Sequence, residues 1–300
     1  MIHPLHTVFL GEVAGAPPEA RGEAYRLAYH KPNRRFLESY HRNWSGLGVG
    51  WVVDRFGSLY PEPMIQYLKS LYGGDGLVRA ATGWLDICRR LLPPPVEPDV
   101  YLMVGVYTSN AFETVIGGRP ALGLCLEHFV PAPGRHPASL GIDPRELPIW
   151  LAHEYAHCVR FSGESASLVR RSVGKGDFDK GRLVRAVPLA EWLLSEGLAV
   201  AFSEATVPGF PLTAYLGYTH RQLRYCQEHE AELWSRFQHV KEAAGEEHYL
   251  LWFEGADEFV EPALPGRSGY HLGYRLVQRL QARSSGMSWS ERMLMDPRMI

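Results

Sequence analysis

The chain has 300 residues, which is enough for one large domain or two modest ones. Its 46% hydrophobic and 21% charged residues are ordinary for a folded protein and exclude wholesale disorder. The formal net charge of −2, from 31 basic and 33 acidic residues, gives no electrostatic basis for binding nucleic acid or an anionic membrane.

The sequence carries no recognisable sorting or membrane signal. Residues 1–6 lack the basic and apolar segments of a signal peptide, and no run of 18 apolar residues occurs anywhere. The cysteines lie far apart and are expected to be reduced, half-buried thiols; they are Cys88, Cys125, Cys158 and Cys226. We therefore expect a cytoplasmic protein that binds neither nucleic acid nor membrane, and the sequence carries no signal for its oligomeric state.

The first hundred residues predict helices. Apolar residues recur at helical spacing within 34–44, 61–71 and 77–92, separated by glycine and proline. Prolines at 93–95 and 98 form a stiff break. We place a boundary there, with an N-terminal helical region at 1–98 and a second domain at 99–300.

A small sheet is expected at 100–130. Residues 100–107 have the β-branched and aromatic composition of a strand, and 112–116 and 121–129 flank Gly117-Gly118 as a hairpin would. The alternation of large and small residues over 121–129 suits an edge strand that another backbone can approach, and it suits a central strand equally. Glu127 and His128 are expected to be structural or solvated, and a proline-rich connector follows at 130–136.

Helices return after residue 143. Asp143 as N-cap, Pro144 at the first helical position and Glu146 two residues later predict a helix over 144–161. Further helices are expected at 188–204, 213–243 and 269–283, the last two within a helical C-terminal part at 213–300. The predicted fold class is α+β, mostly helical.

The helix at 144–161 contains the motif His-Glu-x-x-His. His153 and His157 lie one turn apart on the same face, so both imidazoles can reach one metal ion. Glu154 lies about 100° around the helix from His153, where it can contact a metal-bound water without binding the metal. The alternative is an ordinary helix with two partly exposed histidines and a solvated glutamate.

A third ligand is expected from the helix at 188–204, which is apolar nearly all round. A carboxylate in its middle, Glu196, is costly unless it is paired or coordinated. Gly197 beside it suggests the close approach of another helix. Glu196 could instead pair with a buried arginine; Glu191 and Glu204 are weaker candidates, and Glu204 could orient a ligand histidine. Gly163, at the position of the third metzincin ligand, excludes that subclass.

Three segments together resemble the gluzincin clan of zinc metallopeptidases: HEYAH at 153–157, SEGLAVAF at 195–202 and GYHLGYRLVQRL at 269–280. More narrowly they resemble bacterial zinc-dependent proteases filed as a domain of unknown function. The resemblance covers residues 100–300. It implies a zincin-like core, a small sheet plus an active-site helix, with one Zn²⁺ held by His153, His157 and Glu196 and with Glu154 as general base.

The chain departs from the better-known gluzincins in two places. Thirty-eight residues separate His157 from Glu196, and they include a basic stretch at 169–185 that we expect to be a mobile loop at the cleft. Val200 stands where the usual carboxylate or amide that orients a ligand would lie.

The resemblance also suggests a group that stabilises the oxyanion. Tyr270 is the first candidate and His271 the second, with Ser268 as helix N-cap and Tyr274 on the same face as Tyr270. Alternatively, both tyrosines are core aromatics and His271 is a surface residue.

The function expected from this resemblance is a zinc-dependent peptidase acting on a peptide or protein substrate. Glu154 would take a proton from the metal-activated water that attacks the scissile carbonyl. Two alternatives are a non-peptidase zinc hydrolase and a non-catalytic, zinc-stabilised binding or chaperone-like module.

Overall fold

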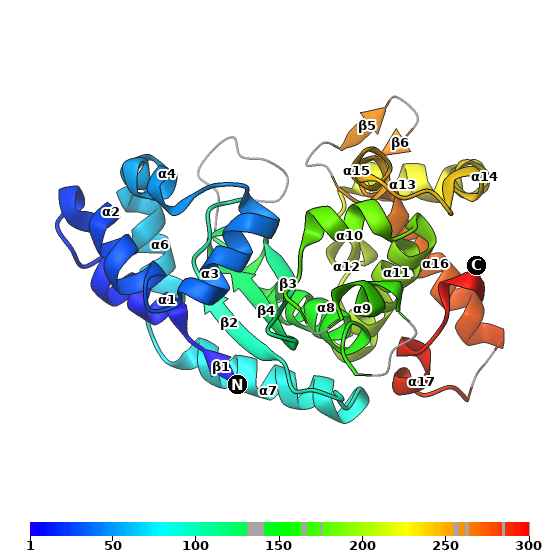
Figure 1. Cartoon of the computed structure of the whole chain (residues 1–300), viewed down its shortest axis with the longest axis horizontal. Helices are drawn as coiled ribbons and strands as arrows, with labels where there is room; N and C mark the ends of the chain where they lie inside the picture. Colours follow the sequence, from blue (N-terminus) through cyan, green and yellow to red (C-terminus); the bar gives the residue numbers. More distant parts are fainter. Residues whose placement is uncertain are drawn as a thin grey trace.

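The structure is a computed structural model that describes residues 1–130, 141–163, 167–174, 176–254, 258–261, 264–283 and 286–299. In these residues it is mostly helical, with one four-stranded and one two-stranded sheet, which confirms the predicted α+β class (Figure 1). Of the connector predicted at 130–136, the described residues include only Val130.

The main sheet has the strand order β1-β2-β4-β3. Its strands are β1 (Ile2–His3), β2 (Asp99–Met103), β3 (Ala111–Ile116) and β4 (Arg119–Cys125). The first two pairings are parallel, and β3 with β4 forms the predicted antiparallel hairpin, in which Gly117 and Gly118 take the positive φ angles of 58° and 78° that the tight turn requires. Strand β4 is therefore central. The hypothesis that 121–129 forms the edge is wrong, because β3 occupies that edge.

Two predicted strands are shorter than expected, and after the first of them tyrosine hydroxyls replace the ladder partners. Strand β2 ends at Met103, after which the backbone N–H of Val104 donates to Tyr29 Oη at 3.0 Å and that of Val106 to Tyr40 Oη at 2.9 Å. Strand β4 ends at Cys125 and continues as a 3₁₀ turn, Leu126–His128.

Glu127 in that turn is structural rather than solvated. Its carboxylate is fully buried and accepts the backbone N–H groups of Gly105 at 2.7 Å and Tyr107 at 3.1 Å. Burial raises the pKa of Glu127 to about 7, and the hydrogen bonds only partly oppose that rise.

Alternation along β3 assigns the two faces of the sheet. Phe112 packs on Phe36 of α3 (Arg34–Tyr40), and Thr114 Oγ1 lies 2.8 Å from Ser39 Oγ of the same helix. Glu113, between them, faces the other way, toward α8 (Leu147–Arg160). Helix α3 thus lies on one side of the sheet and α8 on the other (Figure 1).

The three helices predicted in the N-terminal region are present in the structure. Residues 61–71 and 77–92 correspond to α6 (Glu62–Tyr72) and α7 (Gly76–Leu91), and 34–44 to α3 followed by a π-helical turn. The remaining helices here are α1 (Leu5–Val8), α2 (Arg21–Ala24), α4 (Val49–Asp54) and α5 (Phe56–Leu59), with π-helical turns at Phe9–Val13, Tyr25–His30 and His41–Ser45. The boundary at residue 98 stays a prediction.

The second half contains three of the predicted helices. The helix expected at 144–161 is a 3₁₀ turn (Pro144–Glu146) that leads into α8. The helices expected at 188–204 and 269–283 are α11 (Leu189–Thr206) and α16 (Ser268–Arg283). Residues 213–243 form three helices rather than one, broken at Gly217 and His229: α12 (Leu212–Leu216), α13 (His220–Glu228) and α14 (Glu230–Val240). The prediction of a mobile loop at 169–185 is wrong for the described part of that range, because most of it is helical. It contains most of α9 (Leu168–Val173) and of α10 (Lys180–Ala186). The chain continues through α15 (Glu246–Phe253), β5 (Phe259–Glu261), β6 (Leu264–Pro265) and α17 (Trp289–Met293).

Helices α11 and α16 cross with their backbones in contact. A Cβ atom built on Gly197 would lie 2.2 Å from the carbonyl oxygen of Gly273, and one on Gly273 would lie 2.3 Å from that of Leu193. The prediction that Gly197 allows another helix to approach closely is confirmed. The crossing fixes α11 between α16 and α8.

Candidate metal centre

Helix α8 presents the two histidines. Asp143 caps its entry as predicted, with Oδ1 accepting the backbone N–H of Arg145 at 2.9 Å. His153 and His157 follow one turn apart and are only 3% and 4% exposed, so the alternative of partly exposed histidines is wrong.

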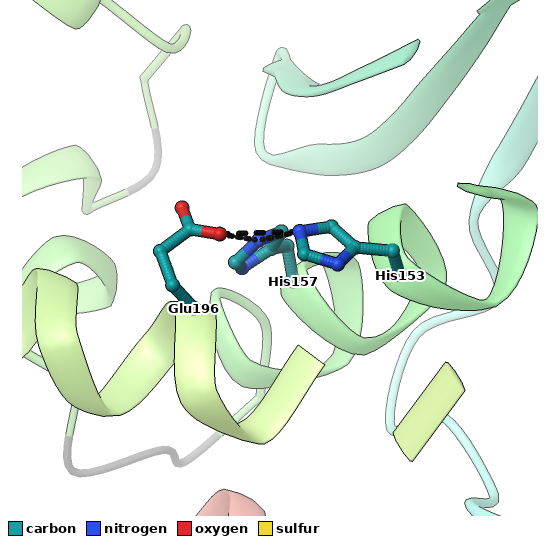
Figure 2. A group of neighbouring side chains, drawn as sticks. All are labelled: His153, His157 and Glu196. Carbon is teal, nitrogen blue, oxygen red and sulfur yellow. Dashed lines mark hydrogen bonds and ion pairs between the residues drawn. The ribbon is translucent and has the colours of Figure 1, made fainter. Parts of the chain in front are cut away.

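Glu196 reaches the same point from α11. Its Oε2 lies 3.1 Å from His153 Nε2 and 3.3 Å from His157 Nε2, and the two Nε2 atoms are 3.1 Å apart. Figure 2 shows the three side chains converging from the two helices. They form the one cluster of potential metal ligands found among the described residues.

The spacing of these donors fits a zinc ion. A tetrahedral zinc with bonds of about 2.0–2.1 Å places its ligand atoms about 3.3 Å apart, close to the three separations observed. Two imidazole nitrogens and a carboxylate oxygen form a donor set that zinc prefers. Neither histidine Nδ1 has a hydrogen-bond partner among the described residues, so no hydrogen bond on that side of the ring sets its orientation.

The surroundings hold two of the three donors, His153 and Glu196, in the state that a metal requires. Burial lowers the pKa of His153 to about 4, which favours the neutral imidazole. Burial acts in the same direction on His157, but the charge and hydrogen bond of Glu196 outweigh it and raise the pKa of that histidine. Burial alone would raise the pKa of Glu196; the two histidines outweigh it and keep the carboxylate ionised.

The other interpretations of the acidic residues on α11 are not supported. Glu191 pairs with the buried Arg160 at 3.0 Å and points away from the histidines, and no arginine of the described residues forms an ion pair with Glu196. Glu204 accepts a hydrogen bond from Tyr274 Oη at 2.7 Å and orients neither ligand histidine.

A cavity of about 450 Å³ adjoins the three donors and opens to solvent. Glu154 lines it beside Glu113 of the edge strand β3, and the two carboxyl groups interact. Burial raises the pKa of both, and their mutual charge raises that of Glu154 further. The pair therefore favours holding a shared proton.

The structure separates the three candidates on α16. Tyr270 lines the cavity, and its ring stacks on that of His153 with centroids 6.1 Å apart and an interplanar angle of 17°. His271 is buried away from the cavity, 3.4 Å from Glu230, and Tyr274 faces Glu204. Ser268 begins the helix, but its buried Oγ has no hydrogen-bond partner among the described residues and so does not cap it.

Sequence reasoning missed four charged residues of the cavity: Glu113, Lys180, Glu254 and Arg267. Glu113 carried a usable signal, because it is a lone acidic residue on a face of β3 otherwise formed by Ala111 and Val115. Arg267 precedes α16 and carried none. Lys180 enters the cavity from α10 and pairs with Glu254.

The comparisons point away from the peptidases. The family model that matches is that of the gliding motility protein GldB, and it covers residues 184–300. No match was found among curated proteins or solved structures. The matched part includes α11 and α16 but not the histidines of α8.

This finding corrects several predictions. The resemblance to gluzincin metallopeptidases is wrong, because the family that matches is a gliding motility family. The peptidase function, the assignment as a hydrolytic enzyme and the base role of Glu154 that followed from it are corrected with it.

The predicted cytoplasmic location is also contradicted, since the matching family is labelled as one of lipoproteins. Within the described residues, no single helix is long and apolar enough to cross a membrane. One bent pair, Lys180–Ala186 with Leu189–Thr206 at 119°, meets that test by length and composition alone.

Proposed function

We propose that this protein binds one zinc ion through His153, His157 and Glu196 and uses it to hold a ligand in the adjoining cavity. The observation that carries the proposal is the mutual spacing of the three donor atoms, 3.1, 3.1 and 3.3 Å, in a buried position. Three protein ligands leave a zinc ion with an open coordination position, as ligand-binding sites require and closed structural sites do not.

A binding role agrees with the comparison. The description of the matching family, gliding motility protein, names a process and no reaction. We propose further that α8, α11 and the sheet form a zincin-like core. The protein would then share the fold of the zincin peptidases but not their peptidase activity. The packing of α8 against β3, β4 and α11 supports that arrangement.

The cavity suggests the size and kind of partner. Its volume of about 450 Å³ is within the range of small-molecule sites, and it would also accept a short segment of a peptide or protein. Four carboxyl groups and two cations line it, and they belong to Glu113, Glu154, Glu196, Glu254, Lys180 and Arg267.

Metal analysis of the purified protein tests the proposal. We expect about one zinc per chain and a fall in zinc affinity of ~10² or more in Glu196→Ala and in His153→Ala, since each removes a ligand. His239→Ala, which changes an exposed histidine of α14, is the matched control and should retain zinc. Stoichiometric zinc with unchanged affinity in Glu196→Ala would refute the ligand assignment.

A further inference from the structure

Arg267 lines the cavity and forms no ion pair with any residue that the structure describes. In the described part of the chain no carboxylate forms an ion pair with its guanidinium, whereas Lys180, the other cation of the cavity, pairs with Glu254. The guanidinium carbon lies 4.2 Å from the ring centroid of Tyr270. Because a phenol is neutral, the positive charge of Arg267 is not balanced by this contact.

The backbone around Arg267 is arranged to hold its side chain in this place. Arg267 has a φ of +59°, one of two positive values at non-glycine residues in the described chain. Gly217 makes room for it, because a Cβ there would lie 2.8 Å from Arg267 Nη1, and the carbonyl of Arg267 accepts a hydrogen bond from Tyr218 Oη. A positive φ at a non-glycine residue costs free energy, and such strained backbone is concentrated at binding and active sites.

The same contacts connect Arg267 to the metal donors. The guanidinium of Arg267 lies over the ring of Tyr270, and the same ring stacks on that of His153. Arg267 and all three donors line the one cavity, and the charge of Arg267 acts on His153, Glu154 and Glu196. A ligand bound in this cavity therefore meets the guanidinium and the metal site together.

We propose that Arg267 is an anion-binding residue and that the ligand of this cavity carries an oxyanion, a carboxylate or a phosphate. The guanidinium offers a planar fork of N–H donors that matches two oxygens of such a group. The inference deepens the proposed function, since the metal would bind the same ligand from the other side.

The test is a calorimetric titration of zinc-loaded protein with sodium acetate and, separately, with inorganic phosphate. Wild type should bind at least one of them, and Arg267→Gln should weaken that binding ~10-fold or more. Arg267→Lys, which keeps the charge but loses the fork, should fall between them. Arg283→Gln removes an exposed cation at the end of α16 that does not line the cavity and is the matched control, with affinity within ~3-fold of wild type. Circular dichroism and zinc content establish that each variant is folded and loaded.

The outcomes separate the two proposals. Stronger binding of acetate identifies a carboxylate ligand, and stronger binding of phosphate identifies a phosphate ester. Binding that depends on Arg267 even in protein freed of metal by EDTA supports the anion site while leaving the zinc proposal to the metal analysis. Failure of both anions to bind folded wild type, or equal affinity in wild type and Arg267→Gln, overturns the inference.

Discussion

Replacing Gly197 by alanine tests how the site is built. The new Cβ would lie 2.2, 2.3 and 2.8 Å from the carbonyl oxygen, carbonyl carbon and Cα of Gly273. All three atoms belong to backbone, so no change of rotamer relieves the overlap. Helices α11 and α16 must separate by about 1 Å to reach an ordinary van der Waals contact.

Two effects of opposite sign decide the change in stability. Alanine is favoured over glycine in a helix interior by about 1 kcal/mol. Inserting a carbon into a fully packed contact costs typically 1–3 kcal/mol and more where backbone must move, as it must here. We expect the overlap to win, with a net loss of about 2 kcal/mol in the free energy of unfolding and weaker zinc binding by the adjoining Glu196.

Urea unfolding of wild type and variants measures this balance. Gly83→Ala in α7 is the matched control, because that glycine is exposed, lies in a helix interior and has no atom within 4 Å of its Cβ position. It should stabilise the protein by roughly 0.5–1 kcal/mol. A Gly197→Ala protein as stable as wild type, beside a control that behaves as expected, would refute the reasoning.

Three further predictions concern other parts of the chain. Arg160→Met leaves Glu191 buried without its ion pair and should lower the unfolding free energy by ~3–5 kcal/mol, and adding Glu191→Leu should restore much of the loss; urea unfolding checks both. Saturating zinc should raise the unfolding free energy by about 2.7 kcal/mol at 100 times Kd, and His153→Ala should abolish this gain in thermal melts. Glu127, with a pKa of about 7 against 4.5 in the unfolded chain, keeps its proton longer when folded, so the unfolding free energy should fall by roughly 3 kcal/mol as the pH rises between those values. Parallel pH profiles for wild type and Glu127→Gln would contradict that interpretation.

The parts of the fold that could be predicted are those encoded locally. The periodicity of α6, α7, α8 and α11 and the glycine turn of the hairpin are properties of neighbouring residues. The position of β4 in the sheet was not predictable, because it depends on the parallel pairing of β4 with β2, from which β3 separates it in the sequence. The end of β2 depends on tyrosine hydroxyls and a glutamate from other segments.

The same division applies to the site. Glu196 was predictable as a partner for the histidines because a lone carboxylate in an apolar helix must find a counterpart. Arg267 was not, since its importance comes from the cavity it enters and from the space left by Gly217. The peptidase function failed for a different reason. It was inferred from short motifs, and the family that matches over residues 184–300 has a different description.

A comparison of Glu191 with Glu196 shows that Glu196 has no cation to balance its charge within the described residues. Glu191 and Glu196 are five residues apart on α11, so they point in different directions, and both meet side chains of α8. Glu191 faces the guanidinium of Arg160, which balances its charge and donates hydrogen bonds. Glu196 faces two imidazole nitrogens that also lie 3.1 Å from each other, and hydrogen bonds cannot satisfy all three of these separations at once because each needs its own proton. One cation among the three atoms would satisfy every one of them and balance the buried charge, which is why we assign the missing partner of Glu196 to a metal ion rather than to a proton.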